Sequence, residues 1–421
     1  MNGDQRYGIS TFLVHLHELF GSFQLTTMVD TFPTMTQAAV VHTSLRDRDG
    51  GESLGRQIRE RFHAAQPDAL IVFSSSRNDH RALLQALAAS CAPRLMIGCS
   101  SAGEFTSAAS GEGLTCAVAL RSSEMVFSAG LGRGITADHQ TVAQQLVAGF
   151  RGLHRPEYRY RTALILIDAL AGHTESLVED LTRLTAGTYQ FVGGGAGDDA
   201  RFQQTHVFYG TEAYTDAAVA LEILSHKPIG IGVRHGWQPA SPAFRVTAAD
   251  AMRLASLNAV PAAEVFEEHA ESTGQSFDRA DPLPFFLHNV LGIKTGDGHK
   301  VRVPLGVDAA GCVACAAEIP VGATAHIMST DVGSAAAAAA GAARDALQQV
   351  QGRKPAVALF FDCVATRLRL DKEFGIELES LATELGTAQY AGFNTYGQIA
   401  RAEGQFSGFH NCTAVVCIIP E

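Results

Sequence analysis

Three short apolar runs constrain what this chain can fold into more than any other feature. The runs Ala69–Phe73, Ala163–Ile167 and Ala356–Phe361 lie between amphipathic segments with helical spacing. They are too short for buried helices and are typical of strands that are covered on both faces. In each case a predicted strand begins about 30–37 residues earlier, which suits a strand–helix–strand unit.

We therefore predict three copies of one unit. The first copy opens with a strand at Ala38–Thr43, the second at Met125–Ala129 and the third at Ala325–Met328. A helix, the apolar strand, a second helix, a third strand, a loop of small residues and a closing strand follow in that order. The predicted fold class is α/β with mixed sheets, in which repeated strand–helix–strand–helix–hairpin units form layered sheets flanked by helices.

The chain is long enough for more than one domain, and the repeats suggest where it divides. We predict an N-terminal extension at 1–36, a domain with two copies at 37–226 and a domain with an insert region and the third copy at 227–421. Within the insert the pattern predicts strands at Ile229–Arg234 and Phe244–Thr247, a helix near Ala262–His269 and a hairpin near Val301–Glu318.

Charge and hydropathy exclude several classes of function. The net charge is −11 and no Lys/Arg-rich stripe occurs, which argues against nucleic acid and anionic membranes as partners. No run of 18 apolar residues is present, and the N-terminal stretch lacks the features of a signal peptide. The eight cysteines are scattered, several of them in strand-like runs, as in reduced cytosolic proteins. We expect a cytoplasmic protein.

A loop rich in small residues follows the third strand of each copy. The loops are 98–105 (GCSSAGEF), 192–199 (VGGGAGDD) and 391–399 (AGFNTYGQI). Glycines let backbone amides approach a ligand closely, and loops at the carboxyl ends of strands are where open α/β sheets bind ligands. The alternative is a glycine bend that turns the chain into the next antiparallel strand. No phosphate-loop motif is present.

These loops also carry a family resemblance, over roughly residues 38–421. The segments GCSSAGEF and GGGAGDDARF with THVFY resemble the N-terminal part of FIST-domain proteins, and FDCVATR, AGFNTYGQI and FHNCTAVV resemble the C-terminal part. The resemblance implies a bacterial sensory module that binds a small ligand. The residues predicted to bind that ligand are Gly98, Cys99, Ser100, Gly103, Glu104, Gly194, Asp198, Cys363, Arg367, Tyr396 and Asn411.

One subgroup, the NosP-type proteins, binds haem and senses nitric oxide, and the resemblance extends to its stand-alone arrangement. It implies a histidine kinase or a cyclic-dinucleotide enzyme as partner, and a homodimer is compatible with it. Haem iron needs an axial side chain in an apolar pocket. The candidates are His235, beside the only tryptophan, and His410, before a predicted buried strand.

Other interpretations stay open. Family members often carry glutamate where this chain has Gln398, and Arg367 lies four residues after the cysteine of FDC rather than two or three. The scaffold can instead sense a cofactor-free metabolite such as an amino acid, with charged groups such as Arg367, Glu104 and Asp198 holding it. A second alternative is an enzyme with Cys363 as nucleophile, although no catalytic motif is present and we expect no enzyme. The lone pair Cys312 and Cys315 lacks the four ligands of structural zinc.

Overall fold

The computed structural model describes residues 35–296, 298–401 and 408–421. The predicted extension at 1–36 therefore lies outside the described residues, except for Met35 and Thr36. No helix in the described part of the chain is long and apolar enough to cross a membrane. Within that part the fold is mixed α/β, as predicted, with the strands arranged in four sheets.

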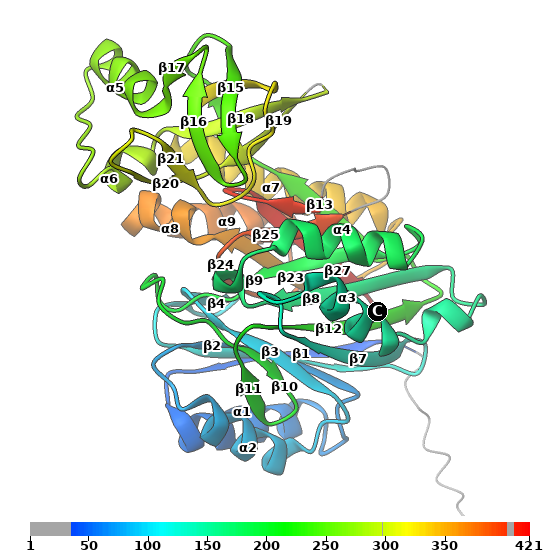
Figure 1. Cartoon of the computed structure of the whole chain (residues 1–421). Helices are drawn as coiled ribbons and strands as arrows, with labels where there is room; N and C mark the ends of the chain where they lie inside the picture. The colour runs from blue at the N-terminus through cyan, green and yellow to red at the C-terminus, as the bar shows by residue number, and fades with distance from the viewer. Residues whose placement is uncertain (1–34, 297, 402–407) are drawn as a thin grey trace, which may run out of the picture. The chain divides into compact units, whose positions relative to one another are not determined.

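The first copy forms a mixed sheet with two helices packed on one face (Figure 1). Its elements are β1 (Gln37–Thr43), α1 (Asp47–Arg61), β2 (Ala69–Ser75), α2 (His80–Cys91), β3 (Met96–Ser101), β4 (Glu104–Thr106), β5 (Ser110–Gly111) and β6 (Thr115–Arg121). β2 and β3 run parallel, while β6 lies antiparallel between β1 and β2. Asp79 caps α2 by accepting the backbone N–H of Ala82.

The second copy repeats this order, with α3 and α4 on the outer face of its sheet. Its elements are β7 (Val126–Arg133), α3 (His139–Ala148), β8 (Tyr160–Ile167), α4 (Thr174–Leu184), β9 (Gln190–Gly195), β10 (Val207–Tyr209), β11 (Glu212–Tyr214) and β12 (Ala217–Ser225). β12 lies between β7 and β8, as β6 lies between β1 and β2. The opening strands and the apolar strands predicted for both copies agree with β1, β2, β7 and β8 to within a few residues at each end.

The third copy starts earlier in the chain than predicted. Its elements are β13 (Gly230–Arg234), α7 (Val332–Gln349), β23 (Pro355–Cys363), α8 (Val364–Leu370), α9 (Phe374–Leu385), β24 (Tyr390–Thr395), β25 (Gln398–Arg401), β26 (Phe409–His410) and β27 (Ala414–Pro420). β13 pairs with β27, so it takes the place of β1 and β7. The prediction that Ala325–Met328 is the first strand was wrong, because that strand pairs inside the insert.

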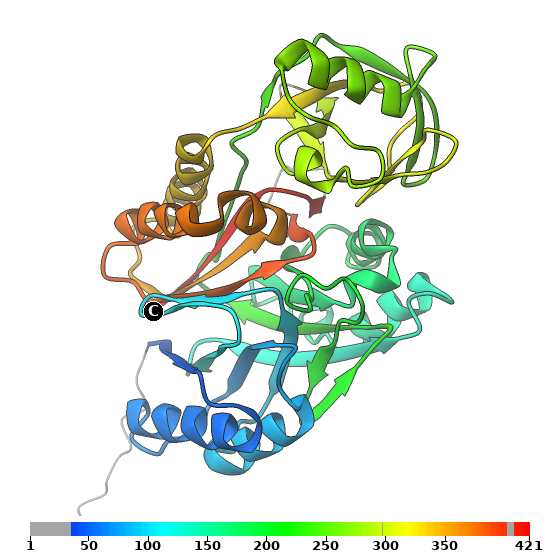
Figure 2. The ribbon, with the colours of Figure 1, turned by 90° about the vertical axis from the view of Figure 1, so that its left-hand side faces the viewer.

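The insert therefore interrupts the third copy between its first strand and its first helix. Its elements are β14 (Gln238–Pro239), β15 (Phe244–Asp250), β16 (Arg253–Leu257), β17 (Val260–Pro261), α5 (Ala262–Thr273), α6 (Leu283–Phe286), β18 (Val290–Thr295), β19 (Gly298–Arg302), β20 (Pro304–Val307), β21 (Val313–Cys315) and β22 (Thr324–Ser329). These strands form one antiparallel sheet that packs with α5 and α6 around its own core (Figure 2). The predicted hairpin at Val301–Glu318 was wrong in part, because β19 pairs with β18 and only β20 and β21 pair together.

The three repeated sheets are linked by an exchange of strands. After β3 the chain crosses into the sheet of the third copy, where β4 pairs with β24. β10 crosses from the second copy to pair with β3, and β25 crosses from the third copy to pair with β9. The inner faces of the three sheets share one apolar core, whereas each outer face packs on its own helix pair. Each copy thus completes the sheet of another.

A glycine makes each exchange sterically feasible. Gly98, Gly193 and Gly392 lie opposite Phe208, Ile399 and Phe105 of the arriving strands. A Cβ at these glycines would lie 2.1, 2.0 and 1.8 Å from a carbonyl oxygen of the neighbouring strands β2, β8 and β23, respectively. Since real side chains do not tolerate such contacts, these positions require glycine.

Candidate functional site

The three small-residue loops hydrogen-bond to one another through their backbones. Gly197 N donates to Ser100 O at 2.9 Å, Asn394 N to Gly103 O at 2.8 Å and Gly195 N to Gly397 O at 2.8 Å, so each loop contacts the other two. The loops turn the chain into the exchanged strands, as the alternative interpretation of a glycine bend predicts. The amides of Gly195, Gly197 and Asn394 are consequently occupied by protein partners.

Several predicted ligand residues are held at the junction of these three loops. Ser100 Oγ accepts His206 N at 2.9 Å, and Glu104 accepts the Ser101 hydroxyl and Leu114 N. Asp198 accepts the Tyr396 hydroxyl and backbone N–H groups of residues 202–204. Although burial opposes ionisation, these hydrogen bonds lower the pKa of Asp198. The side chains therefore stabilise the junction.

Glu104 gives this junction a testable pH dependence. Burial raises the pKa of Glu104 to about 8. From about pH 4.5 to pH 8 the folded chain keeps a proton that the unfolded chain releases, so this group makes stability fall as pH rises. Glutamine at this position has no proton to release. We therefore expect the unfolding free energy of Glu104→Gln, relative to that of the wild type, to rise by up to about 4 kcal/mol between about pH 5 and pH 8, which is about 1.4 kcal/mol per pH unit. Urea titrations at both pH values measure this difference, and a constant difference would contradict the assignment.

A large apolar cavity, here called the junction cavity, lies where the second copy, the insert and the third copy meet. Its volume is about 520 Å³. Its walls are formed by residues 169–176 and 202, by 251–252, 283, 287, 303, 305 and 315–318 of the insert, and by 363–365, 368, 396–397, 409 and 411. Cys315 belongs to the CxxC pair of the sequence. Volumes of this size are typical of small-ligand sites, which often lie where domains meet.

Exposed apolar side chains gather around this cavity. The large hydrophobic residues that line it with 37% exposure or more are Leu170, Phe202, Met252, Leu305 and Leu368. They come from segments far apart in the chain, so the fold brings them together. Contiguous exposed apolar surface in a hollow is typical of a binding site.

One wall of the cavity carries a buried polar group with unused hydrogen-bonding capacity. Asn411 is 3% exposed, and its Oδ1 accepts no hydrogen bond from the described residues. The Cβ of an alanine at Gly397 would lie 3.4 Å from Asn411 Nδ2, so the two residues are close neighbours. A buried acceptor without a partner costs about 1–3 kcal/mol, which a ligand N–H or O–H can offset. The first turn of α4, where no side chain caps the helix, lies in the same cavity wall.

An ion triad joins α4 to the insert beside the cavity. Glu175, a cavity residue, pairs with Lys300 and, at 2.9 Å, with Arg302 on β19. The side chains are 17%, 16% and 3% exposed, respectively. Burial lowers the pKa of both Lys300 and Arg302, which shows the cost of holding these cations here.

The predicted haem ligands lie elsewhere. Neither His235 nor His410 lines the junction cavity. His235 Nε2 is hydrogen-bonded to His299 O at 2.9 Å, and its Nδ1 accepts Trp237 N at 3.3 Å. His410 Nε2 is hydrogen-bonded to Ala400 O at 3.0 Å, and burial lowers its pKa to about 4. Both rings are held by backbone groups.

Three of the predicted ligand residues, Cys363, Tyr396 and Asn411, do line the cavity. The other eight do not line it. Gly98 and Gly194 lie in the strand exchange, Gly103 packs beside Arg367, and Arg367 pairs with Glu112 at 2.6 Å. The exposed apolar residues around the cavity were missed, because single apolar residues in distant segments give no local signal of a shared cavity.

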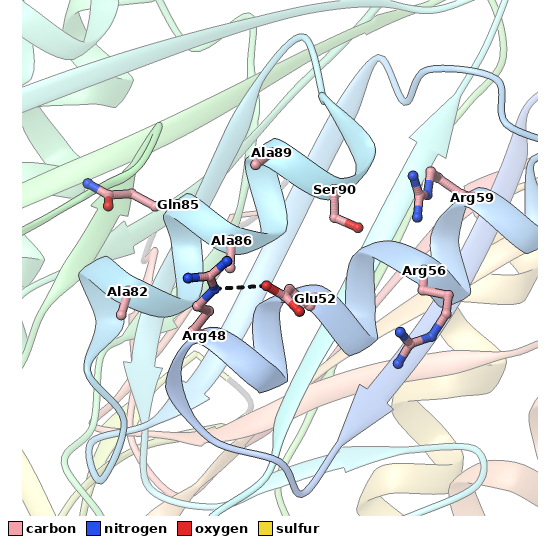
Figure 3. Close-up of a pocket in the computed structure, with 9 residues that line it drawn as sticks. All are labelled: Arg48, Glu52, Arg56, Arg59, Ala82, Gln85, Ala86, Ala89 and Ser90. Atoms are coloured by element: carbon pink, nitrogen blue, oxygen red, sulfur yellow. Dashed lines mark hydrogen bonds and ion pairs between the residues drawn. The ribbon is translucent and has the colours of Figure 1, made fainter.

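A second hollow lies between α1 and α2. Arg48, Arg56 and Arg59 line it with alanines of α2 (Figure 3). Arg48 pairs with Glu52 along the same helix, and the two side chains are 78% and 48% exposed. Such a solvated pair contributes little binding energy. Among the described residues no cluster of three or more His, Cys, Asp or Glu could hold a metal ion.

Comparisons with known proteins match the chain to two family models. The model described as the FIST N domain matches residues 68–260, and the model described as the FIST C domain matches residues 262–401. No curated protein matches the chain.

Solved structures give only a distant likeness. A cyanuric acid hydrolase from A. caulinodans is 8% identical, with 92% of this chain and 100% of that chain covered and a TM-score of 0.31. T. maritima PurL in complex with AMPPCP is 11% identical, with 92% and 73% covered and a TM-score of 0.22. Likeness at this level supports no argument about function.

Proposed function

This chain carries a FIST N domain followed by a FIST C domain and is a FIST-domain signalling module; on that premise we propose that it senses a small ligand in the junction cavity. The ligand has an apolar body and at least one N–H or O–H donor. The observation that carries this proposal is the combination of exposed apolar side chains around the cavity with the unpaired acceptor of Asn411 in its wall.

The position of the cavity suggests how binding is transmitted. A ligand there contacts the first turn of α4, the insert and α8 at once. A ligand shifts a conformational equilibrium by as much as its affinity differs between the two states. Binding therefore favours the arrangement in which these three walls are closed on the ligand. The family resemblance makes a histidine kinase or a cyclic-dinucleotide enzyme the proposed partner.

The haem and nitric oxide prediction receives no support from the two residues that it named. Haem binding requires a side chain free to ligate iron. Both ring nitrogens of His235 have hydrogen-bond partners, and His410, whose Nε2 is hydrogen-bonded to Ala400 O, does not line the junction cavity. We therefore propose a cofactor-free sensor. An absorption band of bound haem that shifts with nitric oxide and disappears on substitution of His235 or His410 would contradict this choice.

Binding of bromonaphthol, which has an apolar body and one O–H donor, tests the proposal. We expect Leu305→Asp to weaken its affinity at least about tenfold, because the carboxylate must be desolvated when the ligand enters. Leu153→Asp is the matched control, since Leu153 is 38% exposed and does not line the cavity. Calorimetric titration of the full chain measures both.

The role of Asn411 is tested with bromonaphthalene, which lacks the hydroxyl. We expect the wild type to bind bromonaphthol more tightly than bromonaphthalene, and Asn411→Leu to lose this preference. Equal weakening of both ligands by Leu153→Asp and Leu305→Asp would reject the junction cavity as the site.

A further inference from the structure

Two cysteines meet at the end of the central strand of the third copy. Cys363 is the last residue of β23, and Cys412 lies two residues before β27, the strand that pairs with β23. Both are free thiols in one buried cluster, and they are hydrogen-bonded to each other. They are 3% and 4% exposed.

Only one of the two thiols faces the junction cavity. Cys363 is part of the cavity wall, whereas Cys412 lines a different and much smaller hollow with Asp362 and Arg369. A small reagent in the cavity can therefore reach Cys363 first. Cys412 is placed to react with whatever forms on the Cys363 sulfur.

The surroundings of Cys363 favour its thiolate. The hydrogen bond with the Cys412 thiol comes first, and backbone N–H groups of Cys412 and Ala365 and the side chain of Gln398 add to it. Together they outweigh burial and lower the pKa of Cys363 to about 6, whereas the pKa of Cys412 is raised. The thiolate, not the thiol, is the nucleophilic form of cysteine, so a lowered pKa increases reactivity near neutral pH.

Charged neighbours do not reverse this preference. Burial raises the pKa of Asp362 well above its usual range and that of Glu377 to about 8, so both carboxyls keep a proton near neutral pH. The cation Arg369 lowers the pKa of Cys412 and so opposes the rise caused by Cys363 and by burial. The site thus combines a reactive thiolate with a second thiol and a nearby cation.

From this geometry we propose that Cys363 and Cys412 form a peroxide-reactive dithiol site, in which Cys363 is oxidised first and Cys412 closes a reversible disulfide. The Cys363 thiolate attacks one oxygen of hydrogen peroxide, the O–O bond breaks, and the hydroxide that leaves takes up a proton to become water. Cys412 then attacks the sulfenic sulfur of Cys363. The S–O bond breaks, the hydroxyl leaves as water with the Cys412 proton, and the two sulfurs are joined. The proposal does not depend on the ligand proposed above.

Mass spectrometry of the full chain tests this site. The chain is treated with hydrogen peroxide, unfolded, alkylated with iodoacetamide and digested. We expect a peptide pair that joins Cys363 to Cys412, lighter by two hydrogen atoms than the two thiols and released by dithiothreitol. In Cys412→Ser we expect dimedone to trap a sulfenic acid on Cys363, and in Cys363→Ser no label at Cys412. Both thiols still free after peroxide, or disulfides between other cysteines only, would overturn the proposal.

Cys315 supplies a control within the unmodified chain, so the test does not depend on a variant that folds. Cys315 also lines the cavity and is 3% exposed, but burial raises its pKa to about 12. We expect the alkylation rate of Cys363 in the folded chain to reach half its maximum near pH 6, well below that of Cys315. The same pH profile for both cysteines would reject the reactive thiolate.

Discussion

Gly392→Ala is expected to destabilise the chain by more than about 3 kcal/mol and to leave it largely unfolded in cells. The added Cβ would lie 1.8 Å from the Phe360 carbonyl oxygen and 2.5 Å from the Phe105 ring. Neither neighbour can move independently, because Phe360 belongs to β23 and Phe105 to the exchanged strand β4, and both strands pair with β24. The yield of folded chain and its urea midpoint measure the effect.

Gly375→Ala is the matched control for this substitution. Beyond its chain neighbours and the backbone of its own helix α9, no atom of the described residues lies within 4 Å of a Cβ at Gly375. Because alanine is the better helix former, we expect this variant to gain up to about 1 kcal/mol. Gly98→Ala, which would place its Cβ 2.1 Å from Val72 O, should behave like Gly392→Ala. If Gly392→Ala and Gly98→Ala both have the urea midpoint of the wild type, the steric account of the strand exchange is wrong.

Glu175→Ala is expected to destabilise the chain by about 3–5 kcal/mol, which is the usual effect of breaking a buried ion pair. The substitution leaves Arg302, which is 3% exposed, and Lys300 without their carboxylate partner. Since buried pairs are poorly screened, the loss should persist in high salt. Urea unfolding with and without salt measures it.

Two variants separate this ion triad from other effects of the substitution. Glu179→Ala removes an exposed carboxylate from the same helix, which acts on Lys300 through its charge without pairing with it, and should change stability by less than about 0.5 kcal/mol. The double variant Glu175→Met with Arg302→Met should recover much of the loss, because it removes the buried cation together with its partner. A loss of equal size in Glu179→Ala would show that the effect belongs to α4 rather than to the triad.

The sequence predicts the local elements of this fold well, because hydrophobic periodicity reports which face of each element is buried. Runs such as Ala163–Ile167 could only be strands, and the structure confirms them. Hydrophobic periodicity does not show which distant strands pair with each other. Ala325–Met328 has the composition of a repeat strand but pairs with β15 and β18 in the insert. The crossing of β4, β10 and β25 into other sheets was equally invisible.

Only part of the candidate site was predicted from the sequence. Motif resemblance identified Cys363, Tyr396 and Asn411, which the structure places in one cavity wall. The same cavity also brings together Leu170 of the second copy and Leu305 of the insert, and neither residue carries a motif. Of the glycines predicted to bind the ligand, Gly98 and Gly194 lie in the strand exchange, whereas Gly103 lies against the side chains of Asn394 and Arg367.

The most direct test of the central claim is a crystal structure of the chain soaked with bromonaphthol, in which anomalous scattering locates the bromine. The account predicts one bromine peak in the junction cavity, with the hydroxyl within hydrogen-bond distance of Asn411 Oδ1. A bromine bound outside that cavity, while calorimetry still shows saturable binding, would contradict it.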